Sequence, residues 1–334
     1  MKNLFAYFNT TNKYNSIYQQ TMLLIERMEH IFGTHVTILD FKGFKAHLNN
    51  ADDLILLPYD SLKPEILLIP KFTNVVFIYH NITPYRFFLR TEPLVALRAI
   101  LGRIQLRRLR HISNQWVAVS EYNRRELERY GFSNVVLCSN QIKPAVPHPT
   151  EKTPEPSMLY VGRIVQNKKC MELLEIALET AQQIGKPTSL YIVGTGKPNT
   201  SYLNQFMKRI DQLNAQGILK VRWQNRLSES ELCKLYQRCW LYVSLSQHEG
   251  FGLPVCESIN NGTPAIYTRC GGQELVLNNY GLADEQQMAA TAHRLLSDAQ
   301  ALSSLYQQQR TLIEAITTPH YDGQIQQVFA PMLK

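Results

Sequence analysis

The sequence predicts an α/β protein made of two doubly wound domains, each with a parallel sheet covered by helices. Short apolar, β-branched runs recur along its 334 residues, and stretches with helical spacing separate several of them. This alternation is typical of strand–helix–strand units and of parallel sheets. A proline-rich stretch divides the chain near its middle, and 334 residues are enough for two domains of ordinary size.

Six strands are predicted in the first domain, which we place at residues 1–145. They are Leu4–Phe8, Val36–Leu39, Leu54–Leu57, Val75–Tyr79, Trp116–Val119 and Val135–Leu137. Apolar residues recur at helical spacing across Asn15–Phe32, so a helix is predicted there that ends at Gly33. Ser120 is a typical N-cap residue and begins another helix that runs to Gly131.

The second domain is predicted at residues 158–315, after a linker at 146–157. Five prolines without an apolar period lie between Pro144 and Pro156, which indicates the linker. A capping box of Ser228 and Glu231 predicts a helix start. Residues 316–334 are interpreted as a C-terminal tail. The expected strands are Met158–Val161, Leu190–Val193, Val221–Gln224, Leu241–Leu245 and Ala265–Tyr267.

Composition favours a globular protein and argues against several classes. Hydrophobic residues make up 45% of the chain, but no window approaches a membrane span and the N-terminus lacks a signal-peptide core, so a cytoplasmic protein is expected. The six cysteines form no CxxC pair, which predicts neither a zinc site nor a disulfide framework.

The basic charge is concentrated in the first half of the chain. Residues 1–150 hold 18 Lys and Arg against 11 Asp and Glu, a net charge of +7, whereas residues 151–334 hold 17 against 16. Such a bias predicts an anionic partner, which is a membrane surface, a phosphorylated acceptor or nucleic acid. No basic–aromatic interleaving and no motif for reading nucleic acid accompany the charge, so nucleic acid is the least favoured.

A helix predicted around Leu94–Ile112 carries much of this charge. One face holds Leu97, Ile100, Leu101 and Ile104, another holds Arg103, Arg107 and Arg110, and no acid occurs between Glu92 and Glu121. A basic amphipathic helix is typical of proteins that rest on anionic lipid, so peripheral membrane contact through these arginines is predicted. The alternative is an apolar stripe in the core and a solvated arginine face.

The stretch from Trp240 to Glu274 carries the most specific chemical pattern. A buried strand is followed by a polar, glycine-rich corner, Gln247–Gly252, and then by a short helix that has Pro254 at its start. This arrangement places unpaired backbone N–H groups at the positive end of a helix, which favours a phosphate or another anion. The corner is therefore a candidate phosphate site.

Two acids flank this corner with a recognisable spacing. Glu249 and Glu257 enclose seven residues that include GFGLP, and a GTP and a GGxE ending in Glu274 follow. This pattern resembles the donor site of the retaining GT-B glycosyltransferases of glycosyltransferase family 4. The resemblance implies two Rossmann-like domains that face a central cleft, with a C-terminal segment that crosses back to the first domain.

The resemblance also assigns roles to the second domain. Arg163 and Lys168 follow its first strand and would hold the donor diphosphate, although Lys169 stands where the family commonly has glycine. Glu257 would bind the nucleotide ribose and Glu249 the donor sugar. Gly250, Phe251, Gly252 and Leu253 would supply backbone N–H groups, and Gly194, in a GTG loop after a strand, would line the nucleotide site.

In the first domain, the resemblance points to His80, which follows the strand Val75–Tyr79 and would contact the donor sugar. Two departures from the family occur here. Asn9-Thr10-Thr11-Asn12 replaces the usual glycine loop, and Ser139-Asn140-Gln141 replaces the common Pro-Asn-Gly.

The resemblance therefore implies a retaining glycosyltransferase, a hexosyltransferase that moves a hexose or N-acetylhexosamine from a nucleotide-diphosphate sugar. The expected acceptor is a glycan, preferably lipid-linked, in bacterial surface polysaccharide such as lipopolysaccharide O-antigen or capsule. The chain has no DxD motif, so neither a metal nor another cofactor is expected. The alternatives are a nucleotide-sugar epimerase on the same fold and a basic nucleic-acid-binding protein.

Overall fold

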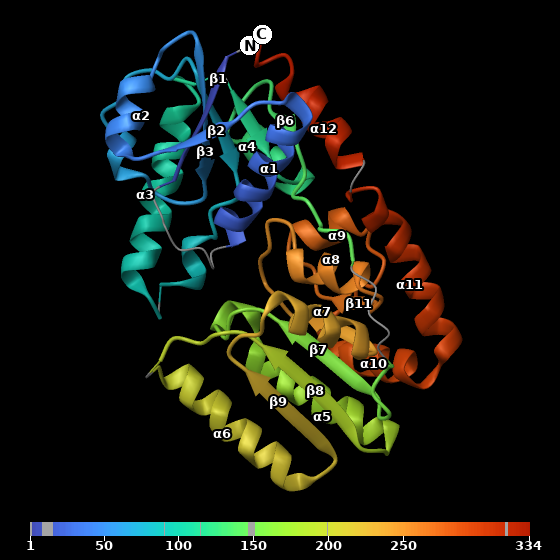
Figure 1. The fold of residues 1–334 in the computed structure, drawn as a ribbon. Coiled ribbons are helices and arrows are strands. Elements are labelled where there is room, and N and C mark those ends of the chain that lie inside the picture. The colour runs from blue at the N-terminus through green and yellow to red at the C-terminus, as the bar shows by residue number, and fades with distance from the viewer. Residues whose placement is uncertain are drawn as a thin grey trace. The chain divides into compact units, whose positions relative to one another are not determined.

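The computed structural model describes residues 2–8, 16–89, 91–113, 115–145, 151–198, 200–317 and 320–334. The chain forms two compact units, one of Met1–Gln141 with Ile316–Lys334 and one of Ile142–Ala315. Each unit contains one fully parallel sheet with helices packed against it (Figure 1).

The first unit has a six-stranded sheet in the order β2-β1-β3-β4-β5-β6. All of its neighbouring strands are parallel. The elements are β1 Asn3–Tyr7, α1 Ser16–Phe32, β2 Val36–Leu39, α2 Phe41–His47, β3 Asp53–Tyr59, β4 Val75–Tyr79, α3 Pro93–Leu109, β5 Trp116–Ala118, α4 Glu121–Arg129, β6 Val136–Leu137 and α12 His320–Phe329, with 3-10 turns at Pro64–Ile66 and Tyr85–Phe87.

Both faces of this sheet are buried, as expected for a doubly wound fold. Along β3, Leu54 and Leu56 point into a cluster with α1 and α12, whereas Ile55 and Leu57 point into a cluster with α2 and α3. The alternation explains why the strand is apolar at consecutive positions, because each face of the sheet has its own helical layer.

The second unit has a five-stranded parallel sheet in the order β11-β10-β7-β8-β9. Its elements are β7 Ser157–Val161, α5 Cys170–Ile184, β8 Thr188–Val193, α6 Ser201–Gln216, β9 Leu219–Gln224, α7 Glu229–Arg238, β10 Leu241–Ser244, α8 Leu253–Asn260, β11 Ala265–Tyr267, α9 Gly272–Val276, α10 Met288–Ser297 and α11 Ala299–Glu314, with 3-10 turns at Gln166–Lys168 and Glu285–Gln287.

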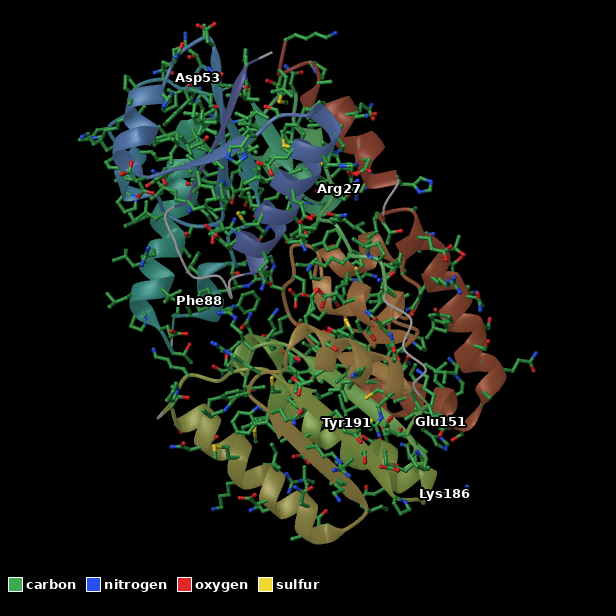
Figure 2. All side chains as sticks on the ribbon, viewed as in Figure 1. Arg27, Asp53, Phe88, Glu151, Lys186 and Tyr191 are labelled. Atoms are coloured by element: carbon green, nitrogen blue, oxygen red, sulfur yellow. The ribbon has the colours of Figure 1, made fainter. Side chains whose placement is uncertain are left out.

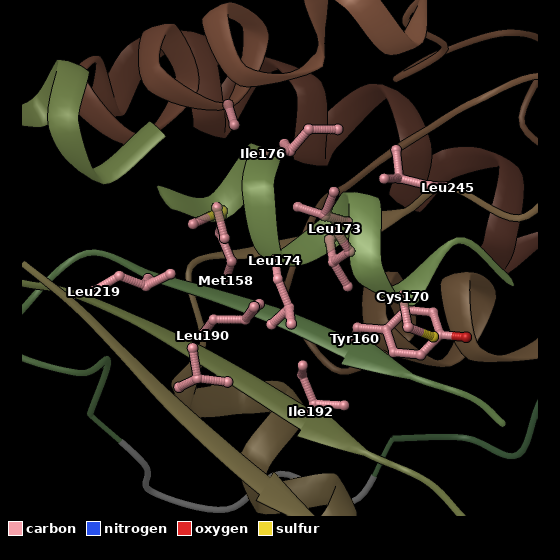
Figure 3. Packing of buried hydrophobic residues seen from close by; sticks show 14 of the residues in the cluster. Met158, Tyr160, Cys170, Leu173, Leu174, Ile176, Leu190, Ile192, Leu219 and Leu245 are labelled. Carbon is pink, nitrogen blue, oxygen red and sulfur yellow. The ribbon is translucent and has the colours of Figure 1, made fainter. Parts of the chain in front are cut away.

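The main core of the second unit joins its sheet to the helices α5, α6 and α10. Met158 of β7 and Leu190 of β8 are fully buried and pack in one cluster with Leu173 and Leu174 of α5 (Figure 3). This packing fixes the strands whose carboxyl ends carry the candidate site.

The segment around the predicted linker packs on the second unit where the structure describes it. The Lys152 ammonium donates to the carbonyl oxygens of Cys239 and Gly262 at 2.6 and 3.1 Å, and the Trp240 indole donates to the Thr153 carbonyl at 2.9 Å. Residues 146–150 lie outside the described residues. Residues 151–157 therefore form part of the second unit.

The C-terminal residues 316–334 belong to the first unit. Ile325 and Phe329 of α12 are fully buried in the same cluster as residues of α1. Arg27, labelled in Figure 2, forms an ion pair with Asp322 of α12. An apolar face and a charge pair thus hold the last helix against the first.

Several local expectations are confirmed. Helix α1 ends before Gly33, which has a φ of +59°, and Ser120 caps α4 by accepting from the Asn123 N–H. The capping box of Ser228 and Glu231 is present at the start of α7.

Four large apolar side chains in the first three turns of helix α3 are exposed, whereas Leu106 and Leu109 near its end are buried. Leu94, Leu97, Leu101 and Ile104 are 77, 51, 39 and 55% exposed. Smaller residues, Ala96, Ala99 and Gly102, face the interior. The interpretation of the leucine stripe as core is therefore wrong, because small residues allow the helix to pack closely on its other side.

The arginines of α3 need a correction as well. Arg103 forms an ion pair with Glu126 and donates to the Ile82 carbonyl, and it is only 17% exposed. Arg110 donates to the Tyr130 carbonyl at 2.7 Å. Arg107 remains exposed beside the Tyr130 ring. Arg103 therefore bonds to groups within the first unit. The prediction that it faces lipid together with Arg107 and Arg110 is wrong for Arg103.

Candidate functional site

The glycine-rich corner connects β10 to α8 and is held by the loop before α9. The Glu249 N–H donates to the Cys270 carbonyl at 3.0 Å, and the Gly272 N–H donates to the Glu249 carbonyl at 2.8 Å. Gly272 has no room for a side chain, since a Cβ atom would lie 2.6 Å from the Gly250 backbone. Glu274 accepts from the N–H groups of Cys270 and Gly271, so the acid of the GGxE motif supports the corner.

Three consecutive backbone N–H groups in the corner lack an acceptor within the described part of the chain. Among the residues that the structure describes, nothing accepts from the N–H of Phe251, Gly252 or Leu253. Gly252 caps α8 with a φ of +94°, and a Cβ atom there would lie 2.3 Å from the Gln273 side chain. Glycine is therefore required for the turn that opens these N–H groups at the positive end of α8, where an anion is favoured.

The loop after β7 brings two cations to the same edge of the sheet. Strands β7 and β10 are parallel neighbours, so their carboxyl ends lie together. Lys168 forms an ion pair with Glu249, and its ammonium lies 3.5 Å from the His248 carbonyl oxygen. The Gln247 N–H donates to the Asn167 carbonyl at 2.9 Å and joins the two loops directly. The predicted Lys168 and Glu249 are therefore in contact.

Arg163 lies in the same loop and is exposed. Its guanidinium has no acidic partner within the described ranges. An uncompensated cation at this edge of the sheet adds to the attraction for an anion.

The backbone conformation of Lys169 explains why a glycine would suit this position. Its backbone is left-handed, with a φ of +52°, and it forms the N-cap of α5. Glycine adopts this conformation without steric cost. Here the lysine side chain forms an ion pair with Glu285, which ties the residue to the protein.

Gly194 permits close contact between two loops. It follows β8 with a φ of +156°, and a Cβ atom there would lie 1.7 Å from the Gly162 carbonyl oxygen. Its own carbonyl accepts from the Trp223 indole at 2.9 Å. Packing alone therefore requires glycine, and contact with a nucleotide remains a prediction.

Glu257 is the fifth residue of α8, and no acid occupies the first turn of that helix. A role in stabilising the helix dipole is thus not supported. Its carboxylate accepts from the Tyr236 hydroxyl at 3.1 Å. Burial raises the pKa of Glu257 to about 7, the Tyr236 hydrogen bond opposes this rise, and the nearby charges of Glu229 and Lys143 act in opposite directions.

His80 belongs to the first unit, at the carboxyl end of β4. Its Nε2 atom is buried without a hydrogen-bond partner in the described part of the chain. Burial lowers the pKa of His80 to about 4, while Asp60 raises it and Lys63 lowers it. The imidazole is therefore neutral at pH 7, with an unpaired nitrogen that fits a hydroxyl group as ligand.

The structure thus gathers most of the predicted residues in the second unit. Arg163, Lys168, Gly194, Glu249 and the corner Gly250–Leu253 all follow the carboxyl ends of β7, β8 and β10, and Glu257 follows on α8. Ligands of open α/β sheets bind at this edge. His80 stands at the equivalent edge of the first sheet.

Sequence analysis missed two residues that hold this chemistry. Tyr236 bonds to Glu257, and Glu126 is a buried acid that bonds to the loop after His80. Tyr236 follows the capping box at helical spacing, so its burial was predictable, but its partner depends on the tertiary packing of α7 and α8.

The described residues contain no group of three or more His, Cys, Asp or Glu side chains able to hold a metal ion. None of the described helices is both long and apolar enough to cross a bilayer.

Two relatives resemble parts of the chain. The serotype-specific mannosyltransferase WbdA of Escherichia coli is 33% identical over 111 residues, which cover 33% of this chain and 13% of WbdA. The GDP-mannose:cellobiosyl-diphosphopolyprenol alpha-mannosyltransferase of Xanthomonas campestris is 34% identical over 113 residues, which cover 33% of this chain and 28% of that enzyme. The matches thus span less than a third of either relative.

Two solved structures share the fold over nearly the whole chain. Sucrose-phosphate synthase from Thermosynechococcus elongatus superposes with a TM-score of 0.79 at 16% identity and covers 99% of both chains. WaaG, a glycosyltransferase involved in lipopolysaccharide biosynthesis, gives a TM-score of 0.68 at 11% identity and covers 98% of this chain and 99% of its own. The predicted α/β class with two Rossmann-like sheets, as in GT-B glycosyltransferases, is confirmed.

The family model described as "Glycosyl transferases group 1" matches residues 143–311. This range is half of the chain and contains every candidate residue of the second unit. The chain therefore belongs to the glycosyl transferases group 1 family.

Proposed function

We propose that the protein is a retaining glycosyltransferase that moves a hexose or N-acetylhexosamine from a nucleotide-diphosphate sugar to a glycan acceptor. The observation that carries this proposal is a shared location: three N–H groups at Phe251–Leu253, which have no acceptor among the described residues, lie at the same edge of the sheet as Arg163 and Lys168. Such a site stabilises the negative charge that develops on a departing diphosphate.

In this proposal Lys168 has the central role. Its ammonium has three N–H donors, of which one meets Glu249 and one points toward the His248 carbonyl. The third remains for a diphosphate oxygen. Glu249 both orients Lys168 and offers its second carboxylate oxygen to the donor sugar, while Glu257 accepts from the ribose hydroxyls. His80 of the first unit hydrogen-bonds the transferred sugar.

The proposed reaction breaks the bond between the anomeric carbon and the diphosphate oxygen. The acceptor hydroxyl attacks from the same face, forms the new glycosidic bond and gives its proton to the departing phosphate. No covalent nucleophile of the protein and no cofactor enters this scheme. The developing oxocarbenium charge on the sugar is offset by the carboxylate of Glu249.

The names of the relatives guide the choice of substrates. One relative is named as a mannosyltransferase and another as a GDP-mannose-dependent enzyme that acts on a diphosphopolyprenol-linked sugar. We therefore propose a lipid-linked glycan of surface polysaccharide as acceptor and GDP-mannose as the first donor to test, with UDP- and ADP-sugars beside it.

Donor turnover with and without a lipid-linked glycan acceptor tests the proposal, after a thermal-shift screen has identified the donor. A ligand that binds the folded state raises the melting temperature. We expect sugar transfer only when acceptor is present, with retained anomeric configuration and undiminished rate in EDTA. Epimerised sugar or free nucleotide without acceptor indicates the epimerase instead, and loss of activity in EDTA contradicts the metal-free scheme.

We also propose peripheral membrane contact at the inner face of the cell membrane, through the outer face of α3. This face consists of Leu94, Leu97, Leu101 and Ile104, which follow one another at intervals of three and four residues. Arg98 and Arg107 flank it and are exposed. An apolar stripe with basic flanks suits insertion at the boundary of an anionic bilayer.

Flotation with vesicles checks this surface. Leu97→Ser with Ile104→Ser should reduce recovery with anionic vesicles at least fivefold, because the inserted apolar area is lost. Arg98→Ser with Arg107→Ser should remove the preference for anionic over neutral vesicles. Met207→Ser, which changes a residue of α6 that is 45% exposed, is the matched control. Equal recovery of all variants contradicts the proposal.

A further inference from the structure

The loop that carries His80 is held by a buried carboxylate from another element. Glu126 of α4 accepts from the Asn81 side-chain amide at 2.5 Å and from the Tyr79 hydroxyl at 2.7 Å. Its other oxygen accepts from Arg103 at 2.9 Å. Residues on both sides of His80 therefore bond to one carboxylate, which is only 12% exposed.

The backbone after His80 is unusual and needs such support. Asn81 has a φ of +80°, a left-handed conformation that non-glycine residues rarely adopt. Arg103 donates to the carbonyl of Ile82, the next residue, and the Ile82 N–H donates to the Tyr79 hydroxyl at 3.3 Å. The turn is thus fixed at its side chains and at its backbone.

Glu126 cannot be replaced by an amide without loss. All the groups around it, from Tyr79, Asn81 and Arg103, are donors. A glutamine would present one N–H₂ group to at least one of these donors, which leaves a buried donor unpaired. The network therefore depends on the carboxylate and not on its volume.

We propose that Glu126 is a positioning residue for the transferase reaction and acts through His80. This inference rests on the proposed function. The network holds the turn at Asn81, and this turn fixes the position of the neighbouring His80, whose buried Nε2 atom has no hydrogen-bond partner among the described residues. Since a displacement of about 1 Å costs as much as 100-fold in rate, a carboxylate that fixes this turn affects the rate without touching the substrate.

A double-mutant cycle tests the proposal. We expect Glu126→Gln to lower kcat between tenfold and 100-fold with little change in the KM for the donor, since the proposed diphosphate site lies in the second unit. In a His80→Ala background the same change should lower kcat less than threefold further, because its route to the reaction is gone. Glu121→Gln is the matched control, since it changes an acid of the same helix whose ion pairs, with Arg124 and Arg125, are partly exposed and lie outside this network.

The outcomes are separable. If the losses from Glu126→Gln and His80→Ala multiply, Glu126 does not act through His80 and the inference is overturned. If the wild type transfers no sugar from any donor, the proposed function fails instead. If Glu126→Gln does not fold, Tyr79→Phe replaces it in the double-mutant cycle, with the same expected result. This change removes one donor to Glu126 and the acceptor of the Ile82 N–H.

Discussion

Replacement of Lys168 by alanine is expected to lower kcat about 1,000-fold. Lys168 forms an ion pair with Glu249 of the corner, and removal of one group that stabilises developing negative charge costs about 100- to 1,000-fold. The upper figure applies here because the change also leaves Glu249, which is 22% exposed, without its cation. The carboxylate then repels the diphosphate that Lys168 attracted.

Steady-state rates with a matched control measure this effect. Lys169→Gly removes the neighbouring cation but keeps the left-handed backbone that Lys169 adopts, so it should retain at least a third of the wild-type rate. The rate of Arg163→Ala should lie between the rates of Lys168→Ala and Lys169→Gly, because the Arg163 guanidinium is exposed and its charge is screened by solvent. Equal losses for Lys168→Ala and Lys169→Gly contradict the assignment.

The second large effect is expected from Glu257→Gln, which should weaken nucleotide binding tenfold to 100-fold and yet stabilise the protein. Hydrogen bonds to a charged acceptor contribute about 1.5–3 kcal/mol, which corresponds to that loss. Burial raises the pKa of Glu257 from 4.5 to about 7. Wild-type affinity should therefore fall as the pH drops below 7, because protonation removes the charge, whereas the glutamine variant should show no such fall.

Stability should change in the opposite direction. The carboxyl of Glu257 binds its proton more tightly in the folded state, so between pH 4.5 and 7 the free energy of unfolding decreases as the pH rises. Above pH 7 the buried charge costs about 3 kcal/mol. The glutamine variant should therefore melt on the order of 5 °C higher at pH 8 and only slightly higher at pH 5. A lower melting temperature at pH 8 contradicts the interpretation.

The sequence predicted the features that depend on local pattern. The strands follow from apolar runs, α7 from its capping box, and the corner at Gly252 from glycines before Pro254. The proximity of Lys168 and Glu249 was predictable, although their ion pair was not, because parallel neighbouring strands bring their carboxyl ends together. Helix α2 had a usable signal that was overlooked, since Asp40 caps it by accepting from the Gly43 N–H at 2.7 Å.

Features set by tertiary packing were not predictable. The spacing of residues in α3 predicts an apolar face and a basic face. It does not show that Gly102 packs against the loop at Ser61 and Leu62. That close approach turns Leu101 and Ile104 outward and brings Arg103 to Glu126. The requirement for glycine at position 194 likewise arises from a neighbouring loop, 32 residues earlier in the chain, and not from a ligand. The predicted departure at Asn9–Asn12 lies outside the described residues.

The most direct measurement of the central claim is calorimetric titration with a nucleoside diphosphate and the matching monophosphate, GDP with GMP and UDP with UMP. If the corner Phe251–Leu253 and Lys168 hold a diphosphate, one of the diphosphates should bind at least tenfold more tightly than its monophosphate. The difference should disappear in Lys168→Ala and persist in Lys169→Gly. Equal affinities in the wild type, or a difference that survives in Lys168→Ala, would contradict the account.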